Sequence, residues 1–290
     1  MSGSSFVAYG DRSGSGKDRY WTFGILTGTS DSLSSIRDSI TNITEGEIPE
    51  TFEWKRITGG KERQANADAV IELVNTVITS VSFGSCRIDV VSWDLHDSRH
   101  SIRKRDDTEN AGRMLYHLFR NVANRWNVHE WSLFIDKNEG FDIDTLVDVL
   151  SRTAISEGLR LQIYQHGDLD SSEEPLMVIP DIFAGMYRWN RQKPELGQRL
   201  AEICHGQCNI FGQLKLSRAD RQRVPVLDAT IQSCRKCGFP LDVKSKGYLW
   251  TRDPSQPINF WPYEPQHIED KAPTKMKHQA ESEMVDWPTE

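Results

Sequence analysis

The chain has 290 residues and a mass of 33.2 kDa, and 37% of its residues are hydrophobic, which is enough for one large domain and an additional module. Its formal net charge of -7 argues against a general nucleic-acid-binding protein, whose surface would be basic throughout. The sequence has no apolar run of about 18 residues, and its first residues lack the apolar core of an export signal. We therefore expect a cytoplasmic protein that does not associate with membranes.

The first predicted elements form a hairpin. A short apolar strand that begins at Phe6 ends on Asp11, and a Ser/Gly turn leads to a second strand with alternating apolar residues from Trp21 to Ile25. Residues 31–49 are polar and broken by Gly and Pro, so they predict a loop with at most a short helix. Residues 52–57 fit either a third strand or the entry to a helix.

Helices and strands alternate after the hairpin. Apolar residues spaced by three or four positions predict helices over 67–81, 111–126 and 143–154. Short apolar runs predict strands over 87–94, 131–136 and 159–163. Residues 176–189 predict a closing helix, with Pro180 near its start and Asp181 in its first turn. The pattern is that of an α/β domain with a mixed sheet, antiparallel at first and parallel later.

Four acids stand at the ends of these elements. Asp11, Asp94 and Asp136 end predicted strands, and Asp181 begins a predicted helix. Strand ends on one side of an α/β sheet converge where ligands bind, and crowded carboxylates repel one another unless a cation lies between them. Oxygen ligands of this kind select Mg²⁺ or Mn²⁺, and two such ions can promote phosphodiester hydrolysis. The alternative is local, because Asp also favours turns and helix caps.

The motifs around three of these acids resemble a known family. Tyr-Gly-Asp11-Arg-Ser-Gly resembles the Asp-Glu-Ser-Gly opening of the bacterial and phage family called domain of unknown function 3800, which is thought to be RNase H-like. Residues 176–185 resemble its closing motif, Leu-Leu-Gln-x-Ala-Asp-x-x-Ala-Gly, and Phe-Ile-Asp136 resembles its internal strand. Phe-Glu-Trp-Lys at 52–55 is loosely similar to its Glu-x-Lys-Trp segment. The likeness spans about residues 6–190.

The resemblance implies an RNase H-like domain and a metal-dependent nuclease of the two-metal-ion type. Asp11, Asp136 and Asp181 would hold Mg²⁺ or Mn²⁺, with Asp94 as a possible fourth catalytic acid. The Glu of the opening motif is Arg12 here, which would place a positive charge where a cation should bind. The resemblance therefore leaves a second interpretation open, a non-catalytic RNase H-like scaffold that contacts a partner protein.

Two further departures from the family concern the other motifs. The closing Gln and Ala are Val178 and Pro180, and around Trp54 the family's Glu and Lys fall on Thr51 and Glu53.

Four of the five cysteines lie close together in the sequence. Cys204 and Cys208 form one pair, and Cys234 and Cys237 form a second, in the spacing of a zinc-ribbon knuckle followed by Gly. Four clustered thiolates favour a structural zinc ion, with free cysteines or a redox pair as alternatives. We therefore predict three parts: an RNase H-like domain over 1–198, a zinc-ribbon-like module over 199–263 and a flexible acidic tail over 264–290.

Positive charge is concentrated in the same module. Residues 186–253 hold 13 Lys or Arg against 6 Asp or Glu, and aromatic residues such as Tyr248 and Trp250 lie among them. Basic residues can neutralise phosphates and aromatic rings can stack on bases; the alternative is a small aromatic core with solvated lysines. The candidate nucleic-acid contacts, including those of an earlier charged loop, are Arg103, Lys104, Arg105, Arg218, Arg221, Arg235 and Lys236.

Overall fold

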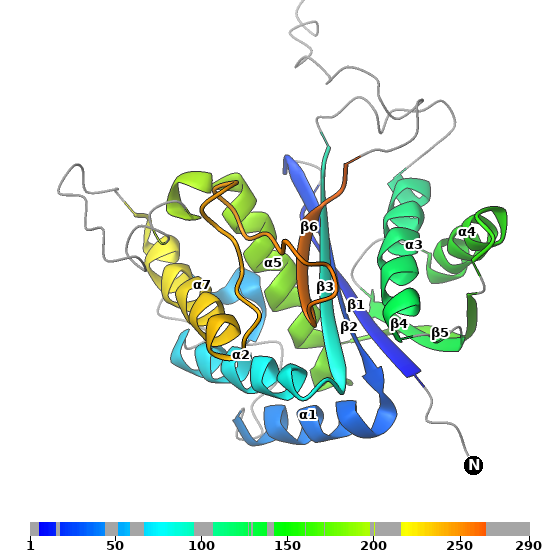
Figure 1. The fold of residues 1–290 in the computed structure, drawn as a ribbon, viewed down its shortest axis with the longest axis horizontal. Helices are drawn as coiled ribbons and strands as arrows, with labels where there is room; N and C mark the ends of the chain where they lie inside the picture. Colours follow the sequence, from blue (N-terminus) through cyan, green and yellow to red (C-terminus); the bar gives the residue numbers. More distant parts are fainter. Residues whose placement is uncertain are drawn as a thin grey trace, which may run out of the picture.

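The computed structural model describes residues 6–15, 18–43, 52–58, 67–95, 107–126, 128, 130–137, 142–159, 161–170, 172–197, 200 and 216–264. They form an α/β fold around a six-stranded mixed sheet with strand order β5-β4-β1-β2-β3-β6 (Figure 1). The strands are β1 Phe6–Ser13, β2 Tyr20–Thr29, β3 Cys86–Asp94, β4 Glu130–Asp136, β5 Gln162–Leu169 and β6 Ile258–Pro262. Among them only β2 runs against its neighbours, so the carboxyl ends of the other five lie on one edge of the sheet.

Helices cover both faces of this sheet. One hydrophobic cluster joins α1, α2, α5 and α7 to one face, and a second joins α3 and α4 to the other (Figure 1). The α-helices are α1 Ser30–Ile43, α2 Ala67–Ser82, α3 Asp107–Trp126, α4 Ile143–Ser156, α5 Val178–Gln192 and α7 Arg218–Lys236. Two short 3₁₀ helices, η2 Trp54–Arg56 and η5 Pro175–Met177, complete the elements that position the site. Among the described residues, no helix combines the length and the apolar character that crossing a membrane requires.

The predicted mixed sheet and most predicted elements are confirmed, with three differences. The polar stretch expected to be a loop forms α1, because Leu33, Ile36 and Ile40 lie on one side and are buried. Residues 54–56 form η2 rather than a strand. The strand expected over 159–163 begins only at Gln162, and because β5 is largely exposed its polar sequence carries no clear alternation.

The described part of the C-terminal segment shares the core of the sheet domain. Helix α7 packs on α2, and β6 adds a parallel strand to β3. Phe260 of β6 is fully buried and stacks on Phe183 of α5, with ring centroids 6.1 Å apart. The described part of this segment therefore belongs to the same hydrophobic cluster as the sheet domain, while residues 198–199 and 201–215, around the expected boundary, lie outside the described residues. The predicted tail, apart from Glu264, lies outside the described residues.

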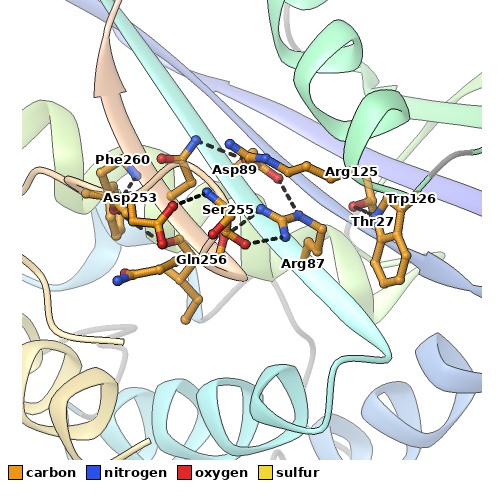
Figure 2. A network of polar contacts seen from close by, with 12 residues as sticks. Thr27, Arg87, Asp89, Arg125, Trp126, Asp253, Ser255, Gln256 and Phe260 are labelled. Carbon is orange, nitrogen blue, oxygen red and sulfur yellow. Dashed lines mark hydrogen bonds and ion pairs between the residues drawn. The ribbon is translucent and has the colours of Figure 1, made fainter. Parts of the chain in front are cut away.

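A buried ion cluster attaches this segment to the sheet (Figure 2). Asp89 of β3 is fully buried and accepts hydrogen bonds from Arg125 of α3 at 2.5 Å and from Asn259 of β6 at 3.1 Å. Arg87 lies 3.4 Å from the same carboxylate and donates to the carbonyl oxygens of Ser255 and Gln256. A buried charge is tolerated only when it is paired and hydrogen-bonded. This cluster therefore fixes the loop before β6 to the edge of the sheet.

Candidate functional site

Two of the predicted carboxylates come from neighbouring parallel strands. Gly10 of β1 is in register with Ile135 of β4, so Asp11 and Asp136, the next residue of each strand, are neighbours at the carboxyl edge. Side chains alternate between faces along a strand, and the residues two positions earlier, Tyr9 and Phe134, stack at 5.7 Å. The two carboxylates therefore project from the same face of the sheet, the face covered by α5.

Helix α5 brings the third carboxylate to this face. Asp181 lies in its first turn, directly above β2, where a Cβ atom on Gly24 would approach the carbonyl oxygen of Pro180 to 2.7 Å. One turn later, a Cβ atom on Gly185 would lie 2.4 Å from the ring of Trp54. The backbone N–H of Trp54 donates to Asp181 at 2.6 Å. Both glycines thus permit the close packing that fixes Asp181.

These three aspartates line a single pocket of about 230 Å³. Acids outnumber bases in its lining, which consists of Asp11, Asp18, Glu53, Asp136 and Asp181, the basic residues Arg12, Lys55 and Arg188, and Ser13, Gly14, Ser15 and Trp54. Nevertheless, within the described ranges no three Asp, Glu, His or Cys side chains are close enough to form a ready-made metal site. The pocket therefore supplies hard oxygen donors of the kind that Mg²⁺ and Mn²⁺ prefer, but an ion would have to draw them closer together.

The segment between α1 and α2 contributes residues that the sequence indicated only loosely. Glu53 accepts from Lys55 at 3.0 Å and from Arg56 at 3.1 Å, and it lines the pocket together with Lys55. Burial lowers the pKa of Lys55, but the hydrogen bond to Glu53 and the charges of Glu53 and Asp181 outweigh it, so the pKa is raised. Lys55 therefore stays positively charged at neutral pH. The only sequence signal for these residues was the loose likeness of 52–55 to the family's Glu-x-Lys-Trp segment.

The turn between β1 and β2 closes the pocket with a second ion pair. Arg188 of α5 donates to the Ser13 hydroxyl at 3.0 Å and lies 3.0 Å from Asp18. Burial raises the pKa of Asp18, but hydrogen bonds from Ser15 and Gln192 and the charge of Arg188 lower it on balance. Neither Asp18 nor Arg188 was expected at the site, because nothing in the sequence of a Ser/Gly turn indicates which helix will cover it.

Arg12 lines the pocket, but its guanidinium lies over the ring of Trp21. It follows Asp11 on β1 and therefore projects from the opposite face, where its guanidinium lies 4.3 Å from the centre of the Trp21 ring. Because Arg12 also lines the pocket, the effect of its charge on a bound cation stays a prediction.

Asp94 is separated from the other three acids. It ends β3, on the far side of β2 from β1, and does not line the pocket. Its carboxylate instead pairs with Arg19 at 2.8 Å. The sequence could not exclude it, because strand order is not encoded in a run of apolar residues that ends on Asp.

Only half of the predicted zinc site lies within the described residues. Cys234 is fully buried at the end of α7, and burial raises the pKa of its thiol; Cys237 is half-buried. Cys204 and Cys208 lie outside the described residues, as do Arg103, Lys104 and Arg105. The other candidate nucleic-acid contacts are exposed on α7, namely Arg218, Arg221, Arg235 and Lys236.

Comparison with known proteins gives relatives along almost the entire chain. No family model matches the sequence. "Uncharacterized protein ORF2" of Methanothermobacter thermautotrophicus is 34% identical over 289 residues, which cover 94% of this chain and 99% of that protein. "Uncharacterized protein ORF2'" of the same organism is 30% identical over 291 residues, which cover 93% and 98%. The chain belongs to the family of these two proteins. Because the alignments extend over nearly the whole length, the family comprises the C-terminal segment as well as the pocket-bearing part.

Proposed function

We propose that this protein is a metal-dependent nuclease with an RNase H-like domain, which hydrolyses phosphodiester bonds by a two-metal-ion reaction. The observation that carries the proposal is the meeting of Asp11, Asp136 and Asp181 in one pocket. These residues come from two strands and a helix that are far apart in the sequence. The hairpin that follows the first acid, and the parallel strand β4 beside it, support the RNase H-like part of the proposal.

The residues of the pocket divide into two chemical roles. Asp11, Asp136 and Asp181 would hold Mg²⁺ or Mn²⁺, which when bound supplies an activated water and stabilises the leaving oxygen. Lys55 and Arg188 place positive charge at the same pocket, where they would attract and orient a phosphodiester. Ion pairs with Glu53 and Asp18 keep these cations positioned before substrate arrives.

The direct test is nucleic-acid cleavage with Mn²⁺ or Mg²⁺ and matched aspartate variants. Asp11→Asn, Asp136→Asn and Asp181→Asn should each lower the cleavage rate by at least about 100-fold, since even residues that only support metal ligands are worth about 10–100-fold. Asp94→Asn is the matched control, because Asp94 ends a strand on the same edge but lies outside the pocket. Equal losses in Asp94→Asn and Asp11→Asn, or full activity in Asp11→Asn, would contradict the proposal.

A non-catalytic scaffold is the second candidate, and one observation favours it. The described acids do not form a ready-made group of three, while Lys55 and Arg188 already provide positive charge beside them. A titration with Mn²⁺ separates the two functions, because an ion that binds only the folded state raises the melting temperature. A nuclease should show this rise and lose it in Asp11→Asn, whereas a scaffold that contacts a partner protein should be indifferent to Mn²⁺.

We also propose a structural zinc ion held by Cys204, Cys208, Cys234 and Cys237. Elemental analysis of freshly purified protein should then give one zinc per chain. Cys234→Ala and Cys237→Ala should both abolish zinc binding and should destabilise the protein equally, because each removes one ligand of the same ion. If no zinc is bound, Cys234→Ala should lower the stability more than Cys237→Ala does, since Cys234 is fully buried and Cys237 is not.

A further inference from the structure

A second pocket lies at the carboxyl end of β6, on the same edge of the sheet as the acidic pocket. Its volume is about 290 Å³. It is lined mainly by aromatic residues with charged groups at its rim, and it comprises His117, Lys246, Trp250, Trp261, Pro262, Tyr263 and Glu264. We call it the aromatic pocket.

The side chains of the aromatic pocket combine ring faces with positive charge. The ammonium group of Lys246 lies 4.7 Å from the centre of the Trp250 ring and 3.9 Å from the carboxylate of Glu264, which lines the same pocket. The rings of His117 and Tyr263 are 5.0 Å apart, and His117 is supplied by α3 on the far side of the strand. The indole N–H of Trp261 is buried and has no hydrogen-bond partner among the described residues. A ligand that fits must offer a flat ring for stacking and an acceptor for the indole, and any phosphate that contacts Lys246 must compete with Glu264.

Cations and rings also cluster around Tyr20, the first residue of β2, which lies between β1 and β3 in the sheet. Arg191 of α5 places its guanidinium 4.2 Å from the centre of the Tyr20 ring and 4.9 Å from that of Tyr248. The guanidinium of Arg19 lies 5.1 Å from the centre of the same Tyr20 ring. Three strand spacings separate β1 from β6, so the pockets are on the order of 15 Å apart along the edge. That span suits a few nucleotides of an extended strand.

We propose that the aromatic pocket binds an unpaired base of single-stranded nucleic acid, whose backbone then follows Arg191 and Arg19 toward the acidic pocket. Single strands expose base faces for stacking and phosphates for cations, whereas a duplex hides its base faces. The binding site stands on the geometry of the aromatic pocket, and its role in presenting a strand for cleavage rests on the proposed nuclease function. The inference specifies the substrate class as single-stranded, with the same chemistry in DNA and RNA.

The test measures binding of fluorescently labelled single-stranded DNA and RNA oligonucleotides in EDTA, so that no cleavage is needed. Trp250→Ala and Tyr263→Ala should each weaken binding by about 5- to 100-fold, the usual range for loss of one base-stacking ring. Trp250→Phe should recover most of the lost affinity, because it restores a ring. Lys246→Gln should reduce the slope of log affinity against log salt by about 0.7, as expected for one phosphate contact on a single strand.

Two exposed aromatic residues serve as matched controls. Tyr164 lies on β5 at the opposite edge of the sheet, and Phe83 lies in the turn after α2, with exposed fractions of 49% and 81%. Tyr164→Ala and Phe83→Ala should bind the oligonucleotides as the unaltered protein does. Melting temperatures of all variants establish that the losses do not come from unfolding.

The outcomes separate this inference from the nuclease proposal. If Asp11→Asn binds normally but does not cleave, and Trp250→Ala loses binding, both are supported. If no cleavage is found under any condition while Trp250→Ala still loses affinity, the nuclease proposal fails and the binding site stands. If neither DNA nor RNA single strands bind, or if the pocket variants bind like the Tyr164→Ala control, the inference is overturned.

Discussion

Asp11 and Asp89 are both buried aspartates in the middle strands of one sheet, yet their surroundings differ. Asp89 is fully buried, and Arg125, Arg87 and Asn259 surround its carboxylate. Asp11 is 6% exposed and faces a pocket lined by four other acids. The carboxylate of Asp89 is enclosed by the groups that pair with it, whereas that of Asp11 lines a pocket together with four other acids and three basic residues. Acids gathered in a pocket are candidates for a functional site.

The comparison divides the acids by their surroundings, into those enclosed by paired groups and those that line the pocket proposed as the active site. Asp94 and Asp220 belong with Asp89, because Arg19 and Lys193 respectively pair with them. Asp136 and Asp181 belong with Asp11, because they share its pocket. The following experiments test this division.

The largest effect on the free energy of unfolding is expected when the buried ion cluster around Asp89 is disrupted. Asp89→Ala should lower the free energy of unfolding by about 3–5 kcal/mol, because it leaves Arg125 and Arg87 buried without their partner. Asp11→Asn, in the absence of divalent ions, should change it by less than about 1 kcal/mol, since removing one of several neighbouring negative charges also relieves repulsion. Urea unfolding in EDTA measures both. Equal destabilisation by the two variants would contradict the claim that Asp89 stabilises the fold much more than Asp11 does.

The next effect concerns the packing that fixes Asp181. Gly185→Ala should cost about 2–3 kcal/mol, because its Cβ atom would lie 2.4 Å from the Trp54 ring and force it to move. The rate of nucleic-acid cleavage should fall as well, because the hydrogen bond that the backbone N–H of Trp54 donates to Asp181 would be disturbed. Thermal unfolding and cleavage rates are the measurements.

Gly167→Ala is the control for this packing. At that position the nearest atoms would be 3.9 Å away, at ordinary contact distance. A Gly185→Ala protein as stable and active as the Gly167→Ala protein would show that the contact between α5 and Trp54 does not position the site.

A third effect is the pH dependence of stability at Asp220 of α7. Burial raises the pKa of Asp220, but hydrogen bonds from Lys193, Ser217 and Trp189 outweigh it and lower the pKa to about 2. A carboxyl with a lowered pKa stabilises the fold above its unfolded-state pKa of about 3.9, and this contribution is lost as the pH falls toward 2. It amounts to about 2–3 kcal/mol at most.

Asp220→Asn tests this contribution. The variant should be less stable than the original protein at pH 6 and should lose less stability on acidification to pH 3. Urea unfolding at the two pH values provides the comparison. An unchanged acid dependence would mean that Asp220 does not belong with the paired aspartates.

The sequence allowed prediction of what depends on short-range patterns. Asp11 and Asp136 were found because each ends an apolar run, and Asp181 because it stands in the first turn of a helix with Pro180 before it. Their meeting in one pocket followed from the general geometry of α/β sheets. The same pattern also selected Asp94, because it does not reveal that β2 separates β3 from β1.

What could not be predicted depends on contacts between distant segments. Lys55 belongs to a three-residue 3₁₀ helix, which is too short for periodicity, and Glu53 directly precedes that helix. Both reach the pocket because Trp54 packs closely against Gly185. Likewise β6 has only five residues, and its place beside β3 depends on Asp89, a residue about 170 positions away from it. A segment that looks like a separate module in composition can therefore complete the core of the domain before it.

The smallest expected effect separates the adjacent residues Asp11 and Arg12. Arg12→Gln should cost about 0.5–1 kcal/mol of stability, the value of an exposed cation–π contact such as the one with Trp21. Although Arg12 lines the pocket, its guanidinium lies over Trp21, so its removal should alter cleavage less than Asp11→Asn does. Arg12→Glu, which introduces the acid of the resembling family, should likewise change the Mn²⁺ concentration needed for half-maximal stabilisation by less than about tenfold. A larger gain in Mn²⁺ affinity would show that the Arg12 charge opposes the cation, and would assign both residues of this pair to the site.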